Sequence, residues 1–218
     1  MSDWLALASR THAGTPVDVL VMLTLLGLAP FLLVMCTSFV RIAVVLSLVR
    51  SAIGASAVPP NAALTGLALV LTLVVMAPTL RAIQSAAVAP YARGRITQSQ
   101  ALLRAVQPLR AFMLRQAHVA DIALFERIAG RTGQPPERAP ITVLLAAFAV
   151  GELRSGFAIG FALYLPFVAI DLAVASILMG LGMVMLSPPV VSLPVKLLLF
   201  VMVDGWALVC GGVATSFR

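Results

Sequence analysis

The longest nearly uncharged run constrains this chain more than any other feature. Phe157 to Leu186 makes thirty positions, and Asp171 is the only charge among them. The chain of 218 residues carries only 11% charged side chains, against about 25% in ordinary soluble domains. So few charges cannot cover the surface of a soluble protein of this length. The surroundings of the run must therefore be lipid or other protein, which predicts an integral membrane protein.

Other apolar runs flank this one along the chain. A helix needs about 20 residues to cross a hydrocarbon core of about 30 Å. The candidates are Val19 to Val40, with a kink expected at Pro30, Leu64 to Leu80, and Val190 to Phe217. Ile141 to Val150 is apolar but too short to span alone. We predict an all-α integral membrane protein with about four apolar helical segments and kinked helical hairpins, the last hairpin turning at Ser187-Pro188-Pro189.

The region from Arg81 to Pro140 has a different composition. It contains nine arginines and only three acids. Between Arg104 and Arg127, apolar residues recur at helical spacing, which predicts one or two amphipathic helices outside the bilayer core. The stretch GRTGQPPERAP, residues 130–140, predicts a loop. We therefore divide the chain into N-terminal apolar helices (1–80), a polar helical region (81–140) and C-terminal hairpins (141–218).

Charge and cysteine usage exclude several function classes. The net charge of +7 comes almost entirely from arginine, and on a membrane chain it indicates topology and anionic headgroups rather than nucleic acid. Cys36 and Cys210 lie in apolar runs, and His12 and His118 are far apart, so no metal or cofactor is expected. The first apolar run is too long for a signal peptide and is expected to be retained.

Five charges lie in or beside apolar runs. At mid-bilayer, each costs at least ~2.5–3.5 kcal/mol and needs a partner. They are Glu152, Arg154, Asp171, Lys196 and Asp204. If the hairpin folds around Pro188, Asp171 lies opposite Asp204 and about 12 Å in depth from Lys196. We therefore do not expect Asp171 and Lys196 to pair within one hairpin. The hypothesis is that the five charges meet partners in neighbouring subunits. The alternatives are snorkelling into water-filled gaps and a proton relay.

No motif of a known enzyme class is present. Two intramembrane aspartates invite comparison with aspartyl proteases, but Asp171 sits in AIDLA and Asp204 in MVDGW, which match neither the YD nor the GxGD motif. Metalloprotease, serine-hydrolase and P-loop signatures are also missing from the sequence. The chain is predicted not to be an enzyme.

The sequence resembles the FliP/SctR (YscR) family, membrane proteins of the bacterial type III export apparatus. The resemblance extends from about Leu20 to Phe217. Its stretches are TSFVRIAVVLSLVRSAIG, PPNAALTGLALVLTLVVMAP, PLRAFMLRQ, ADIALFERIA, GELRSGFAIGFALYLPFVAIDLAVASILMGLGMVMLSPP and SLPVKLLLFVMVDGW. The family more often has larger residues at Gly151 and Gly156, so the local helix is expected to be weakest there.

The resemblance implies a structural, pore-forming subunit of an export gate in the bacterial inner membrane. Five copies would assemble with a small two-helix partner (FliQ/SctS-like) and a third membrane subunit (FliR/SctT-like). Unfolded secreted proteins would pass through, and the polar region would face the periplasm, with the assembled gate raised towards it. The alternative outside this family is a small-molecule or ion permease, whose buried acids would bind cargo.

The resemblance also implies a role for the methionines before the last turn. Met179, Met183 and Met185 would line the gate as an adaptable apolar gasket, although the family often has a further methionine where this chain has Val184. Methionine is flexible and apolar, so a ring of methionine side chains can close completely when it is empty and open around an extended chain of any sequence. Ser187, Pro188 and Pro189 would form the turn that projects it.

Two observations favour the injectisome branch of the family over the flagellar branch. Flagellar members typically have a cleaved signal peptide, whereas this chain starts directly with its first apolar run. They also read Pro-Pro where this chain reads Ser187-Pro188. The expected function is therefore a virulence-type secretion gate, with the flagellar export gate as the alternative.

Overall fold

The computed structural model describes residues 20, 23, 24, 27, 30, 31, 34–55, 58–131, 135–183 and 185–217. This part of the chain is all-helical, as the sequence predicts. Nine of the 22 residues of the first apolar run, 19–40, lie outside the described residues, so the kink predicted at Pro30 stays a prediction.

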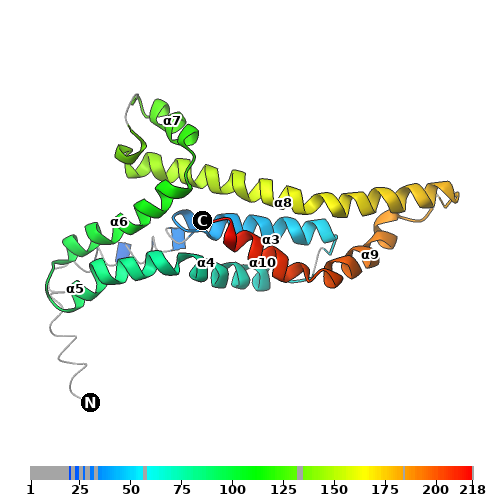
Figure 1. Cartoon of the computed structure of the whole chain (residues 1–218), viewed down its shortest axis with the longest axis horizontal. Helices are drawn as coiled ribbons and strands as arrows, with labels where there is room; N and C mark the ends of the chain where they lie inside the picture. The colour runs from blue at the N-terminus through cyan, green and yellow to red at the C-terminus, as the bar shows by residue number, and fades with distance from the viewer. Residues whose placement is uncertain are drawn as a thin grey trace, which may run out of the picture.

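The described elements follow one another with short connections (Figure 1). In chain order they are α3 (Phe39–Ile53), α4 (Asn61–Ile83), the π-helical η1 (Gln84–Val88), α5 (Ala89–Ala92), α6 (Gln98–Gln116), α7 (Val119–Ile128), the 3₁₀-helical η2 (Pro136–Arg138), α8 (Ile141–Gly180), α9 (Pro188–Met202) and α10 (Gly205–Thr215).

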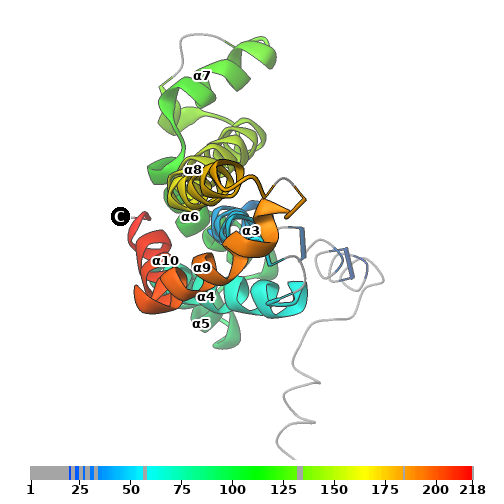
Figure 2. The same cartoon turned by 90° about the vertical axis from the view of Figure 1, so that its right-hand side faces the viewer.

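Helix α8 sets the length of the molecule. Its 40 residues extend about 60 Å, twice the thickness of a hydrocarbon core. Figure 1 shows it running along one side, with α6 and α7 near its start and α9 folding back from its end. Seen end-on in Figure 2, α3 lies between α8 and α4. Because α8 is twice as long as the bilayer is thick, bilayer lipid alone cannot cover it.

Helix α3 approaches α8 closely because glycines face it. A Cβ added to Gly156 would lie 3.2 Å from Val44 Cβ, and one added to Gly160 would lie 2.3 Å from Leu48 Cδ1. These two glycines therefore make the small-residue helix contact that their spacing predicts. A Cβ on Gly180, by contrast, would meet nothing within 4 Å.

Two apolar cores lie along α8. One joins α3, α4, α9 and α10 to Phe167 of α8, and Phe200 packs edge-on against Trp206 there. The other joins α6 and α7 to the first turns of α8, with Phe112 and Phe148 in edge contact. The predicted amphipathic region is indeed two helices, which meet where Ala117 and His118 become extended.

The structure corrects two predicted boundaries. The sequence suggested separate runs on either side of Gly151 to Gly156, but α8 is continuous through them. The charges there have partners on other helices, and the glycines let neighbouring helices pack closely. The helix therefore continues through this stretch. The last run, predicted as one segment, is instead two helices bent by 64°.

Two of the described helical segments are long and apolar enough to cross a membrane. They are Asn61–Ala92 and α8, and the bent pair of α9 and α10 would make a third if it counts as one span. In α8 only 11% of the most apolar stretch is buried within the chain. Such exposed apolar helices are typical of a membrane protein.

Candidate functional site

The three methionines named from the sequence lie at the tip of the hairpin formed by α8 and α9. Met179 is 67% exposed, Met183 is 45% exposed and Met185 is fully exposed. Figure 1 shows this tip projecting past the ends of α3 and α10. Leu181 and Leu186 beside them are exposed too. The tip is therefore an apolar surface that the described part of the chain leaves uncovered.

Local sequence explains why the chain turns there. Helix α8 ends at Gly180, and Gly182 adopts a left-handed backbone with φ of +71°, which glycine adopts at little cost. Ser187 is extended and precedes α9, where Pro188 and Pro189 take the first helical positions. Proline is suited to those positions because its missing N–H would be unpaired anyway. Residue Val184 lies outside the described residues.

An ion pair closes the hairpin behind the tip. Lys196 Nζ lies 2.5 Å from Asp171 Oδ2, and Ser192 Oγ donates to Asp171 Oδ1 at 2.6 Å. Lys196 also donates to the carbonyl of Ala52 at 3.2 Å, in the last turn of α3. Gly54, in the left-handed conformation, ends that helix. A cation at a helix C-terminus is electrostatically favourable.

The prediction that Lys196 and Asp171 would not pair inside one hairpin is wrong. It assumed that depth is counted from Pro188 on both arms. In the structure, α8 ends at Gly180 and α9 begins at Pro188, so the residues between them belong to neither arm of the hairpin. Asp171 lies nine residues before the end of α8, and Lys196 lies eight residues after the start of α9. The two residues are therefore at nearly the same depth.

Glu152 is the most deeply buried charge of α8, and its partner is Arg41 of α3. The guanidinium lies 2.5 Å from Glu152 Oε1 and 3.1 Å from Oε2. Arg41 is 4% exposed and Glu152 is 0% exposed. Arg41 also donates to the Ser216 carbonyl at 2.9 Å and to Gln116 Oε1 at 3.3 Å. The ring of Phe217 lies 3.9 Å from its guanidinium carbon. One arginine thus joins α3, α6, α8 and the end of α10.

Arg154 pairs with Asp121 of α7 at 2.7 Å. Asp121 is 2% exposed, whereas the arginine side chain is 56% exposed. The hypothesis that Glu152 and Arg154 find their partners in neighbouring subunits is therefore corrected, because both are paired inside the chain. The observation that they do not face each other on one helix still holds, since each faces a different neighbouring helix.

Asp204 differs from the other four charges. It is exposed and makes no ion pair within the described part of the chain. It lies at the bend between α9 and α10 and has a left-handed backbone, with φ of 49°. Its predicted contact with another subunit stays a prediction.

Sequence reasoning missed the partners of these charges. The sequence pattern did not assign Arg41 to Glu152 or Asp121 to Arg154. A usable signal existed for Arg41, because it is a lone cation between two apolar runs. It therefore needs a buried acid as much as Glu152 needs a cation. The Ala52 carbonyl that binds Lys196 has no sequence signal.

Comparison with known proteins places the chain in a family. The FliP family model matches residues 22–213. The chain belongs to the FliP family. The flagellar biosynthetic protein FliP of Pectobacterium carotovorum is 49% identical over 92% of this chain and 78% of its own length. FliP of Caulobacter vibrioides is 46% identical over 93% of this chain and 76% of its own length. FliP of Bacillus subtilis is 41% identical, with 94% of each chain covered.

These FliP relatives correct the preference for the injectisome branch, because they are named for flagellar biosynthesis. The sequence criteria behind that preference were weak. The Bacillus subtilis FliP aligns over nearly the whole of both chains, so a flagellar relative need not be longer than this protein. The Ser187-Pro188 turn begins α9 as a Pro-Pro turn would, since proline still occupies the first two helical positions.

Proposed function

We propose that this protein is a structural subunit of the flagellar protein export gate in the bacterial inner membrane. It would help to form the pore through which unfolded substrates leave the cytoplasm. Family membership and the names of the relatives support the assignment to flagellar export. The exposed methionine tip of the hairpin supports the role within it.

The tip is the single observation that carries the proposal. Methionine is a hydrophobic side chain, and exposing a cluster of it to water is unfavourable unless something covers it. A ring of tips from sister copies would bury Met179, Met183 and Met185 against one another. Such a ring excludes water and ions when empty and yields to an extended chain of any sequence.

The length of α8 supports assembly into a larger particle. A helix of 40 residues, mostly apolar and little buried within its own chain, exceeds what a bilayer covers. About five sister copies, a FliQ-like two-helix subunit and a FliR-like subunit would cover the rest. In that arrangement the polar region, 81–140, would face the periplasm and the gate would be raised towards it.

The permease alternative loses its main argument. It relied on buried acids that would be free to bind cargo. Glu152 and Asp171 are instead held by Arg41 and Lys196 inside the chain, which makes them structural.

The gasket is tested by replacing methionines at the tip. The double variant Met183→Ala/Met185→Ala should leak ions across the inner membrane during active export, because alanine leaves the ring open. Met202→Ala is the matched control, since Met202 is an exposed methionine on α9 away from the tip. Swimming and the cytoplasmic ion content of the same cells are measured together. A tight membrane in the double variant, with normal export, would sink the gasket assignment.

A further inference from the structure

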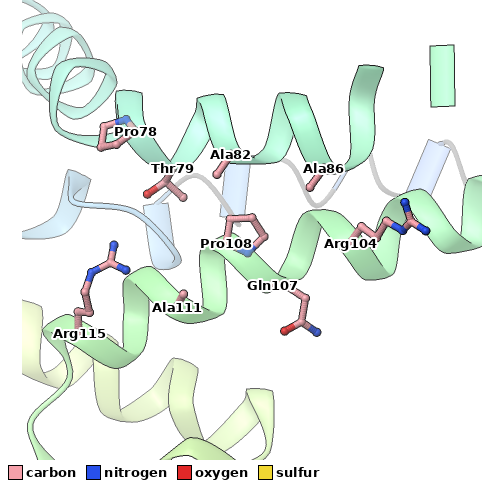
Figure 3. A pocket seen from close by; sticks show the side chains of 9 residues that line it. All are labelled: Pro78, Thr79, Ala82, Ala86, Arg104, Gln107, Pro108, Ala111 and Arg115. Carbon is pink, nitrogen blue, oxygen red and sulfur yellow. The ribbon is translucent and has the colours of Figure 1, made fainter. Parts of the chain in front are cut away.

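An open groove of about 580 Å³ lies between α4 and α6, far along the molecule from the hairpin tip. Figure 3 shows its two walls. Ala82 on α4 and Ala86 on η1 form one, and Pro108 and Ala111 on α6 form the other. These side chains are small, so the two helices leave space between them. The methionine gate makes no use of this groove.

The two ends of the groove carry arginines. Arg104 lies at the end near Ala86, and Arg115 lies at the end near Thr79 (Figure 3). They are eleven positions apart on α6, about 16 Å along its axis. Neither makes an ion pair or a side-chain hydrogen bond within the described chain. Arg110 on the same helix is different, because it donates to the carbonyls of Glu137 and Ala139 at 2.7 and 2.6 Å.

Acids of the chain do not neutralise these arginines. The polar region contains nine arginines and three acids. Two of those acids, Asp121 and Glu126, belong to α7 and are buried, and Asp121 is already paired with Arg154. The groove therefore presents unpaired guanidinium groups, which bind phosphate in a bidentate fashion.

The groove begins where the apolar face of α4 ends. Val74 is 63% exposed on this membrane-crossing segment, and Pro78, one turn later, already lines the groove. Arg81 marks the end of the apolar run. The apolar surface of α4 and the arginines of α6 thus lie beside the same groove, as the acyl chains and the phosphate of a phospholipid require.

We propose that this groove binds an anionic phospholipid. The phosphate lies at Arg115, at the Thr79 end of the groove, and Arg104 attracts the headgroup from the other end. The acyl chains lie against the exposed face of α4. Charge complementarity and continuity with the membrane span select a lipid over a second copy of this chain, whose corresponding surface is equally cationic. A zwitterionic lipid fits less well, because its ammonium offsets the attraction of the arginines. The inference does not depend on the gate.

The test uses the full-length protein in a neutral detergent. Native mass spectrometry measures the retention of added phosphatidylglycerol and of phosphatidylcholine. The wild type should bind phosphatidylglycerol at least tenfold more tightly. Arg104→Gln/Arg115→Gln should lose about 25-fold, at about fivefold per arginine. The control Arg127→Gln/Arg131→Gln removes the same charge from exposed positions outside the groove and should lose less than twofold.

A second measurement needs no variant. A photoactivatable phosphatidylglycerol should label wild-type peptides that contain residues 78–86 and 104–115. Equal binding of the two lipids, an equal loss in the control variant, or labelling elsewhere would each overturn the proposal. A dimer that Arg104→Gln/Arg115→Gln abolishes, with no lipid bound, would also overturn it and would assign the groove to a second copy.

Discussion

Lys196 on α9 and Asp171 on α8 form an ion pair of 2.5 Å that closes the hairpin bearing the methionine tip. The same ammonium donates to the Ala52 carbonyl at the end of α3. One side chain therefore holds both arms of the hairpin together and ties them to the central helix. We therefore expect the position of the tip to depend on this contact.

Lys196→Met should loosen the hairpin and leave the remaining helices folded. Asp171 would lose its cation and Ala52 its donor. Breaking a fully buried pair costs about 3–5 kcal/mol, and the 40% exposure of the Asp171 side chain reduces this to about 1–3 kcal/mol. Thermal unfolding in detergent micelles and proteolysis near 181–187 measure the effect. Val195→Met is the control, because Val195 is exposed on the same helix.

A second substitution separates charge from packing at this site. Lys196→Met/Asp171→Leu removes the orphaned carboxylate as well, and it should recover part of the stability that Lys196→Met loses. If the double variant is less stable than Lys196→Met, the ion pair is not what closes the hairpin.

Arg41→Met should be among the most destabilising changes in the chain. It leaves Glu152 charged and 0% exposed, which costs about 3–5 kcal/mol. Arg41→Met/Glu152→Met should be clearly more stable than the single variant, since two apolar side chains replace the pair. Melting temperature in micelles measures both, and Arg127→Met at an exposed position serves as the control. A single variant that melts with the control would contradict the role of this pair.

The helical class and the apolar runs could be predicted from the sequence because hydrophobic length alone indicates them. The continuity of α8 could not. Glu152 and Arg154 look like an interruption until Arg41 and Asp121 approach from other helices. Partners at such long separations in the chain leave no periodic signal.

The predicted difference in depth between Asp171 and Lys196 was wrong for a different reason. The sequence shows the turn residues Ser187, Pro188 and Pro189, but it does not show that α8 stops seven residues earlier, at Gly180. Gly182, with its left-handed backbone, was the available clue. The predicted role of the methionines concerns neighbouring subunits and stays a proposal.

Gly160→Leu should separate α3 from α8. Even a bare Cβ at this position would lie 2.3 Å from Leu48 Cδ1, so a larger side chain must displace the helix at a cost of about 1–3 kcal/mol. Leu48→Ala should rescue the variant in part by making room. Gly180→Ala is the control, because a Cβ there meets nothing within 4 Å and alanine favours the helix. The melting temperatures of the wild type, the Gly160→Leu variant, its Leu48→Ala double variant and the control measure the effect. A Gly160→Leu variant as stable as wild type would contradict the close contact.

Asp204 could matter either for its backbone conformation or for its charge, and two substitutions distinguish these roles. Its left-handed backbone at the bend is tolerated by Asn and Gly and costs a β-branched residue about 1–2 kcal/mol. We therefore expect Asp204→Asn to melt like wild type and Asp204→Val to melt lower. Native electrophoresis of the membrane complex adds a second readout, because a charge contact between subunits would make Asp204→Asn lose assembly without losing stability. If Asp204→Val melts like wild type, the bend does not depend on this residue, and only the charge role is left for it.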